Sequence, residues 1–110
     1  MNKTGYLGEL ESMILLAILR LGEEAYGMSI REELERRADR AVTRSAAYIT
    51  LERLVAKGYV STRMGDPSPR RGGKAKRYYE LTAAGRVALQ TVGRALRNLW
   101  AGHESLLDEA

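Results

Sequence analysis

A basic segment with a glycine pair constrains this chain more than any other feature: residues 70–77 read Arg-Arg-Gly-Gly-Lys-Ala-Lys-Arg, with five cations and no acid. Residues 59–64 before it and 77–82 after it alternate in the manner of strands, and two prolines interrupt the chain between them. The pattern predicts a two-stranded hairpin with a long basic tip. Because an isolated hairpin is only marginally stable in water, this hairpin has to pack against helices.

Two helices are predicted near the start of the chain. Apolar residues recur at spacings of three and four between residues 8 and 22, which is the period of a helix. Leu15, Leu16 and Leu19 widen its apolar surface, so we expect this helix to be buried on more than one side. A second helix, from about residue 25 to about residue 38, carries an apolar residue every fourth position. Its solvent-exposed face is expected to hold Arg31, Glu32, Glu33, Glu35, Arg36 and Arg37.

A third helix is predicted over residues 43–57. Thr43 is a suitable N-cap because its hydroxyl can accept a hydrogen bond from a free amide of the first turn, and Gly58 ends the helix. Leu51 and Leu54 mark the face that turns toward the core. Two helices separated by a tight turn, the second starting at a threonine, follow the pattern of a helix-turn-helix.

The outward face of this third helix supplies candidate residues for contact with nucleic acid. A recognition helix needs a slim N-terminal half that fits the major groove, with side chains that reach bases and phosphates. The free amides of its first turn also favour a phosphate. The alternative is an ordinary solvated helix, on which Tyr48 has a purely structural role. The candidate DNA-binding residues of the helix are Thr43, Arg44, Ser45, Ala46, Tyr48, Ile49 and Arg53.

The basic segment extends this candidate surface. Its cations can neutralise phosphates and release counterions, and its two glycines allow the backbone to approach a groove closely. The net charge of +4 also favours an anionic partner. The alternative is a solvated tip that only prevents aggregation. The candidate phosphate-binding residues are Arg70, Arg71, Lys74 and Lys76, with Arg77 beside them.

A long last helix is expected to follow the hairpin, capped by Thr82 and extending to about residue 107. About 25 residues of helix span roughly 37 Å, which is more than a small core needs. Its apolar positions step by three and four like a heptad seam, so we expect it to pack against a second copy of the chain. Trp100 and His103 are candidates for a ligand pocket between subunits, although Trp100 could simply fill the interface. The expected dimer-interface residues are Leu89, Val92, Leu96, Leu99, Trp100 and Leu106.

The composition argues against several other classes of function. The chain has no cysteine and a single histidine, so disulfides, thiol catalysis and cysteine zinc sites are excluded and His103 is not a credible metal ligand. No constellation of catalytic residues is recognisable, so we expect no enzyme activity, cofactor or metal. The longest apolar run, residues 13–19, is too short to cross a bilayer, and no leader peptide is recognisable. A cytoplasmic protein without membrane contact is therefore expected.

Several motifs resemble the PadR family of bacterial transcriptional regulators, in particular its short members with one C-terminal helix. The resemblance extends over about residues 7–85, and the order and spacing of the motifs make it fairly specific. The matching motifs are Leu-Gly-Glu-Leu-Glu at 7–11, Ile-Leu-Leu-Ala-Ile-Leu at 14–19, Ala-Tyr-Gly at 25–27 with Ile30, Tyr-Ile-Thr-Leu-Glu-Arg-Leu at 48–54, Gly-Tyr-Val at 58–60, Arg-Gly-Gly-Lys at 71–74, and Arg-Tyr-Tyr-Glu-Leu-Thr at 77–82 with Gly85.

The resemblance implies a dimeric winged helix, usually a repressor that a phenolic acid or a hydrophobic drug releases from its operator. It places the DNA-facing residues around 43–48 and 70–76. In some short members a tryptophan of the last helix lines a drug-binding pore, to which Trp100 is similar. The chain lacks the larger C-terminal domain of the longer members, which argues against a phenolic acid.

The expected fold is mainly α with a small β-hairpin. Residues 1–82 are expected to form a winged helix-turn-helix DNA-binding domain, and residues 83–110 a C-terminal dimerisation helix of the same compact domain. We expect a sequence-specific DNA-binding regulator, a repressor that responds to a small hydrophobic or aromatic effector and binds an inverted repeat in double-stranded DNA as a homodimer. The alternative is a winged-helix adaptor whose basic wing binds an acidic protein partner.

Overall fold

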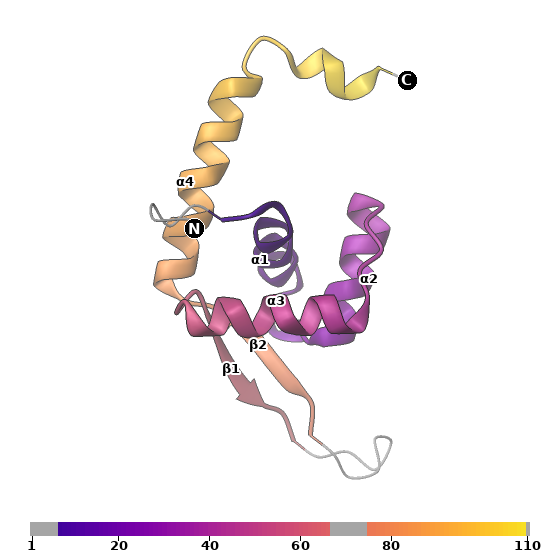
Figure 1. Ribbon diagram of the computed structural model, residues 1–110, viewed down its shortest axis with the longest axis vertical. Helices are drawn as coiled ribbons and strands as arrows, with labels where there is room; N and C mark the ends of the chain where they lie inside the picture. Colours follow the sequence, from indigo (N-terminus) through magenta and orange to yellow (C-terminus); the bar gives the residue numbers. More distant parts are fainter. Residues whose placement is uncertain (1–6, 67–74, 110) are drawn as a thin grey trace.

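A computed structural model of the chain describes residues 7–66 and 75–109 (Figure 1). The described part is mainly helical and contains one antiparallel hairpin, as the sequence predicts. The hairpin pairs Val60 with Leu81 at its base and Met64 with Arg77 at its far end. The elements in chain order are α1 (Glu9–Leu21), η1 (Gly22–Glu24), α2 (Gly27–Ala38), α3 (Arg44–Ala56), β1 (Val60–Met64), β2 (Arg77–Leu81), α4 (Ala83–Trp100) and η3 (Glu104–Asp108).

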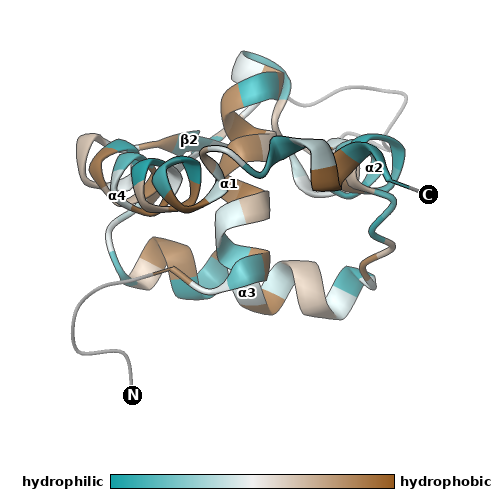
Figure 2. Ribbon diagram, turned by 90° about the horizontal axis from the view of Figure 1, so that it is seen from above, coloured by the Kyte–Doolittle hydropathy of each residue, from teal (hydrophilic) through white to brown (hydrophobic). Residues whose placement is uncertain are grey.

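Helix α1 occupies the centre of the molecule. It lies between α2 and α4, and α3 crosses near one end of α1 (Figure 1). The hairpin extends away from the helices, on the side opposite the free end of α4. Figure 2 shows the apolar colour concentrated along α1. Burying an isoleucine or leucine side chain contributes about 1.5–3 kcal/mol, so this centre supplies much of the stability. The largest fully buried side chains are Ile14, Leu15, Ile30, Leu51 and Leu54.

The two threonine caps predicted from the sequence are both present. The hydroxyl of Thr43 accepts a hydrogen bond from the amide of Ala46 at 3.1 Å, at the start of α3. The hydroxyl of Thr82 accepts one from the amide of Gly85 at 3.0 Å, at the start of α4. Thr82 also donates to the carbonyl of Gly58 at 2.6 Å, so this cap ties α4 to the turn that follows α3.

Helix α4 ends at Trp100, so the prediction of one helix to about residue 107 is wrong. Ala101 leaves the helical conformation, and Gly102 has a φ of 85°, in the left-handed region that favours glycine. The 18 residues of α4 span about 27 Å. A separate 3₁₀ segment, η3, follows the turn and carries Leu106, while His103 precedes that segment. The two residues therefore do not continue the apolar seam of α4.

Burial differs from the sequence expectation at two places. Leu16 and Leu19 of α1 are 48% and 45% exposed in the single chain, so α1 is not enclosed on that side. Glu33, expected on the solvent face of α2, is instead nearly buried beneath three arginines. Its carboxylate accepts hydrogen bonds from Arg20 at 2.8 Å, from Arg36 and from Arg37 at 3.2 Å. The bond from Arg20 is the main reason that the pKa of Glu33 lies below its ordinary value.

Candidate nucleic-acid interface

The N-terminal half of α3 is anchored on one face and open on the other. Ala47 and Leu51 are buried in the core. Tyr48 and Ile49 are more than half exposed, and Arg44 is also exposed. Because α3 begins at the Thr43 cap, its first turn presents small side chains and free amide groups to the outside. This half of the helix has the slim exposed profile that a recognition helix needs.

A groove of about 630 Å³ runs between this half of α3, the start of α2 and the start of β2. Among the residues that the structure describes, its lining contains four cations and three tyrosines but no acid. The apolar part of the lining comes from Met28, Ala47 and Leu51. A concave surface with this charge distribution favours an anionic ligand. The cations are Arg31, Arg44, Lys76 and Arg77, and the tyrosines are Tyr26, Tyr48 and Tyr79.

The first residue of β2, at the far end of the paired strands, is tied to α3 through an ion pair. The guanidinium of Arg77 donates to the carboxylate of Glu52 at 2.8 Å, and both side chains are a little over one third exposed. The Arg77 guanidinium also lies 5.5 Å from the ring centre of Tyr79, which is buried in the core. Arg77 therefore positions the strand and is only partly available to a ligand.

Lys76 is similarly engaged. Its ammonium lies 3.8 Å from the centre of the Tyr26 ring, within the range of a cation–π contact. The side chain is half-buried against the groove wall rather than extended into solvent. The other cations predicted for the tip, Arg70, Arg71 and Lys74, lie outside the described residues, as do the two glycines between them.

The structure separates Arg53 from the remaining candidates on α3. Arg53 does not line the groove and belongs to another hollow, of about 390 Å³, near the N-terminal end of α1. Thr50 and Lys57 contribute to the same hollow, and Lys57 is paired there with Glu11. Ala46 is half-buried, so its methyl group is less accessible than the helical wheel predicts.

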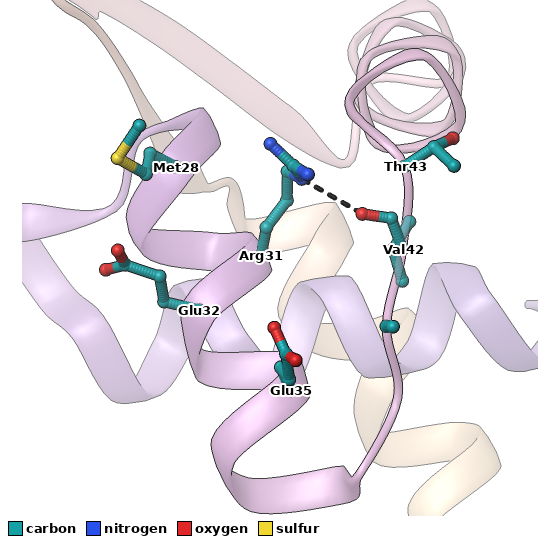
Figure 3. A pocket seen from close by; sticks show the side chains of 7 residues that line it. Met28, Arg31, Glu32, Glu35, Val42 and Thr43 are labelled. Carbon is teal, nitrogen blue, oxygen red and sulfur yellow. Dashed lines mark hydrogen bonds between the residues drawn. The ribbon is translucent and has the colours of Figure 1, made fainter.

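Arg31 is a structural residue that sequence reasoning missed. It was expected only on a solvated face, yet its guanidinium donates a 2.9 Å hydrogen bond to the carbonyl of Val42 (Figure 3). This bond holds the turn between α2 and α3 directly before the Thr43 cap. A hollow of about 450 Å³ opens beside it, with Met28 and Glu32 on its α2 side. The six charged residues of α2 gave no signal that would distinguish Arg31, because the contact depends on how the turn folds back.

Much of the apolar face of α4 is exposed in the single chain. Leu96 is 50% exposed and Leu99 is 76% exposed, whereas Leu89 and Val92 are partly buried against the core. Trp100 is half-buried at the end of the helix. Leu106 and His103 are exposed beyond the turn, and the His103 amide donates to the Trp100 carbonyl at 2.7 Å. The two candidate effector-binding residues are therefore adjacent, although only Trp100 belongs to α4.

Two further classes of site find no support within residues 7–66 and 75–109. No cluster of three histidine or acidic side chains there could hold a metal ion. None of the helices in this part of the chain has the length and apolar character needed to span a membrane.

Comparison with protein families gives a match over most of the chain. A family model described as the transcriptional regulator PadR-like family matches residues 15–91. Comparison with functionally curated proteins gives no significant match.

Several solved structures share the fold. A PadR family transcription regulator of Clostridium difficile R20291 superposes with a TM-score of 0.69 at 20% identity, covering 88% of this chain and 97% of that one. A PadR-like transcription factor of Bacteroides fragilis has a TM-score of 0.68 at 26% identity, covering 88% of each chain. Bacillus subtilis PadR, solved in complex with operator DNA, has a TM-score of 0.64 at 25% identity, covering 76% of this chain and 45% of that chain.

Proposed function

This chain belongs to the PadR-like family of transcriptional regulators, and from that premise we propose that it binds operator DNA as a homodimer and represses transcription. The observation that carries the proposal is the groove beside the exposed N-terminal half of α3, whose described lining contains no acid and in which the Arg44 side chain is exposed. The similarity in fold to Bacillus subtilis PadR, which was solved with operator DNA, supports it.

In this proposal α3 supplies the base contacts. Arg44 and Ser45 are exposed at the entry to the helix, where side chains of a recognition helix reach base edges. Ile49, 56% exposed one turn later, can contact a thymine methyl group. The free amides behind the Thr43 cap favour a phosphate. Tyr48 borders the groove and can donate its hydroxyl to the DNA backbone. The remaining proposed DNA contacts are Ala46 and Arg53 on α3 and Arg70, Arg71 and Lys74 of the basic segment. Lys76, the other candidate of that segment, is held over the Tyr26 ring instead.

Dimerisation is assigned to residues 83–110 and DNA binding to residues 1–82. The proposed interface centres on Leu96 and Leu99, because exposed leucines along one helix face are costly in water and favour burial against a partner. Leu89, Val92, Trp100 and Leu106 extend it. A twofold axis through this interface would present two α3 helices to half-sites about 34 Å apart, which corresponds to an inverted repeat.

We assign the effector, a small hydrophobic or aromatic molecule, to the neighbourhood of Trp100 and His103. Trp100 is the only tryptophan of the chain, so its fluorescence reports on this neighbourhood alone. Quenching or a spectral shift on titration with planar apolar compounds, together with release of DNA, supports the assignment. An unchanged spectrum across such a panel argues against it.

Selection of bound duplexes from a random pool tests the central proposal. The expected product is an inverted repeat with half-sites about one helical turn apart. Enrichment of a single, non-repeated site would contradict the dimeric arrangement. Binding without any sequence enrichment, but with a steep dependence on salt, would reduce the function to non-specific association with DNA.

A further inference from the structure

Tyr26, directly before α2, forms a cluster with three residues toward the far end of the paired strands. The four residues, Tyr26, Arg63, Lys76 and Tyr78, comprise two tyrosines and two cations, and we call them the stem cluster. We propose that the stem cluster positions the hairpin relative to α2 and α3 for DNA binding, and that Lys76 and Arg63 act within the protein rather than as phosphate contacts. The expected effect on DNA binding rests on the proposed function, whereas the contacts within the stem cluster do not depend on it.

The backbone supplies the first part of this attachment. Tyr26, the residue before α2, forms an isolated antiparallel bridge with Tyr78 of β2. The amide of Tyr79 donates to the carbonyl of Ala25 at 2.9 Å. The link between η1 and α2 therefore pairs with β2 at a single bridge, and this joins the helix-turn-helix directly to β2.

Side chains reinforce the same junction. The rings of Tyr26 and Tyr78 meet edge to face, with centres 5.7 Å apart and planes at 76°. The ammonium of Lys76 lies 3.8 Å from the Tyr26 ring centre, and the guanidinium carbon of Arg63 lies 4.4 Å from that of Tyr78. Arg63 also donates to the carbonyl of Glu23 in η1 at 3.0 Å. Both cations therefore have interaction partners inside the protein.

The hairpin is held on both faces. Alternation along β2 turns Tyr79 into the core and Tyr78 to the other side, against Tyr26. On the core side, Arg77 is bonded to Glu52 of α3. The two faces of β2 are thus connected to different helices, so the hairpin cannot tilt without breaking one set of contacts.

Gly65, directly after β1, shows how closely the backbone packs against the Tyr78 ring. A Cβ atom at this position would lie 2.6 Å from Cε2 of Tyr78, so any other residue would displace the ring. The Gly65 amide donates to the carbonyl of Lys76 at 2.7 Å, just before the strands enter the segment that connects them. This hydrogen bond is therefore a natural reporter of whether the stem is closed.

The first experiment uses the free protein and requires no DNA. Hydrogen exchange of the Gly65 amide is measured by NMR in the wild type, in Tyr78→Leu and in the matched control Tyr78→Phe, which keeps the ring. Tyr78→Leu should accelerate exchange about tenfold or more, and Tyr78→Phe should stay close to the wild type. Arg63→Gln, at an exposed position, serves if Tyr78→Leu does not fold, and should also accelerate exchange. Unchanged exchange in a folded Tyr78→Leu or in Arg63→Gln overturns the proposal.

The second experiment measures DNA affinity as a function of salt. Tyr78→Leu changes no charge, yet it should lower the slope of log affinity against log salt by about two phosphate contacts, because the hairpin no longer presents its cations together.

Tyr26→Leu and Lys76→Met are then combined in one double variant. If Lys76 acts through Tyr26, the double variant should bind DNA no more weakly than either single variant does. A further loss of about 0.9 in slope from Lys76→Met in the Tyr26→Leu background would make Lys76 a direct phosphate contact and overturn its assignment. Absence of DNA binding by the wild type would sink the proposed function while leaving the exchange result valid.

Discussion

The ammonium of Lys57, directly after α3, donates a 2.7 Å hydrogen bond to the nearly buried carboxylate of Glu11 on α1. The amide of Gly8 donates to the other oxygen of the same carboxylate at 2.9 Å. Burial of the Glu11 carboxyl opposes its ionisation, but the bonds from Lys57 and Gly8 outweigh that effect and hold the pKa of Glu11 below its ordinary value. The pair links the central helix to the C-terminal end of the proposed recognition helix.

Glu11→Gln should therefore destabilise the fold by about 1–2 kcal/mol, since a charge-assisted hydrogen bond is lost at a nearly buried site. Glu9→Gln is the matched control, because Glu9 is paired with Arg40 at an exposed position. The control should change the free energy of unfolding by less than about 0.5 kcal/mol. Urea unfolding measures the free energy of unfolding of both variants. Equal losses would show that the burial of Glu11 does not affect its contribution to stability.

Stability should fall in mild acid. Glu11 and Glu33 both have a pKa lowered in the folded state, in Glu33 chiefly by the bond from Arg20. The unfolded chain therefore binds protons at higher pH than the folded chain does, and the stabilising contribution is complete above the ordinary glutamate pKa of about 4.3. It is lost as the pH falls through the lower folded-state pKa values. Melting temperatures of the wild type and of the Glu11→Gln/Glu33→Gln variant, taken from about pH 6 to pH 3, should converge at the acid end. Parallel curves would be inconsistent with this linkage.

Leu96→Asp should dissociate the proposed dimer. A charge at the centre of an apolar interface is expected to weaken association by about 2 kcal/mol or more, or roughly thirtyfold. Gln90→Asp introduces the same charge on another face of α4, where it should leave the mass unchanged. Light scattering coupled to gel filtration distinguishes the species. A wild type that is monomeric at all concentrations would contradict the interface.

Arg44→Ala should weaken operator binding by about 1–3 kcal/mol and relax specificity at one base position, provided that this residue contacts a base edge. Arg94→Ala is the control, because it removes the same charge from an exposed position on α4. Fluorescence anisotropy on the selected duplex and on a scrambled one gives both quantities. If the two variants bind alike, the loss reflects net charge alone and Arg44 has no specific role.

Gly85→Ala should prevent stable folding or destabilise the protein by at least about 3 kcal/mol. A Cβ atom there would lie 2.2 Å from the carbonyl oxygen of Tyr59, and this backbone is itself held by the Thr82 amide at 3.1 Å. Gly27→Ala is the comparison, since a Cβ atom at Gly27 meets nothing within 4 Å. Its effect should stay within about 1 kcal/mol. Thermal unfolding of the two variants measures the difference.

The sequence alone determined the elements whose causes are local. Thr43 and Thr82 cap their helices through amides only three residues away, and the apolar period predicts α1 and the core face of α3. Alternation in residues 59–64 and 77–82 predicts the hairpin. The family could also be recognised from ordered motifs, because these motifs encode the same local turns and caps.

The tertiary structure decided what the cations do. Arg77 pairs with Glu52, which lies 25 positions away in the sequence, and Lys76 lies over Tyr26, which lies 50 positions away. No local sequence pattern connects residues that far apart. Glu33 is buried because Arg20 reaches it from another helix. The end of α4 at Trp100 was also beyond the seam pattern, since an apolar period continues through Gly102 while the backbone does not. The charge and the apolar period of a sequence identify the side chains that a segment carries. Only packing decides which of them meet a partner inside the protein and which stay open to a ligand.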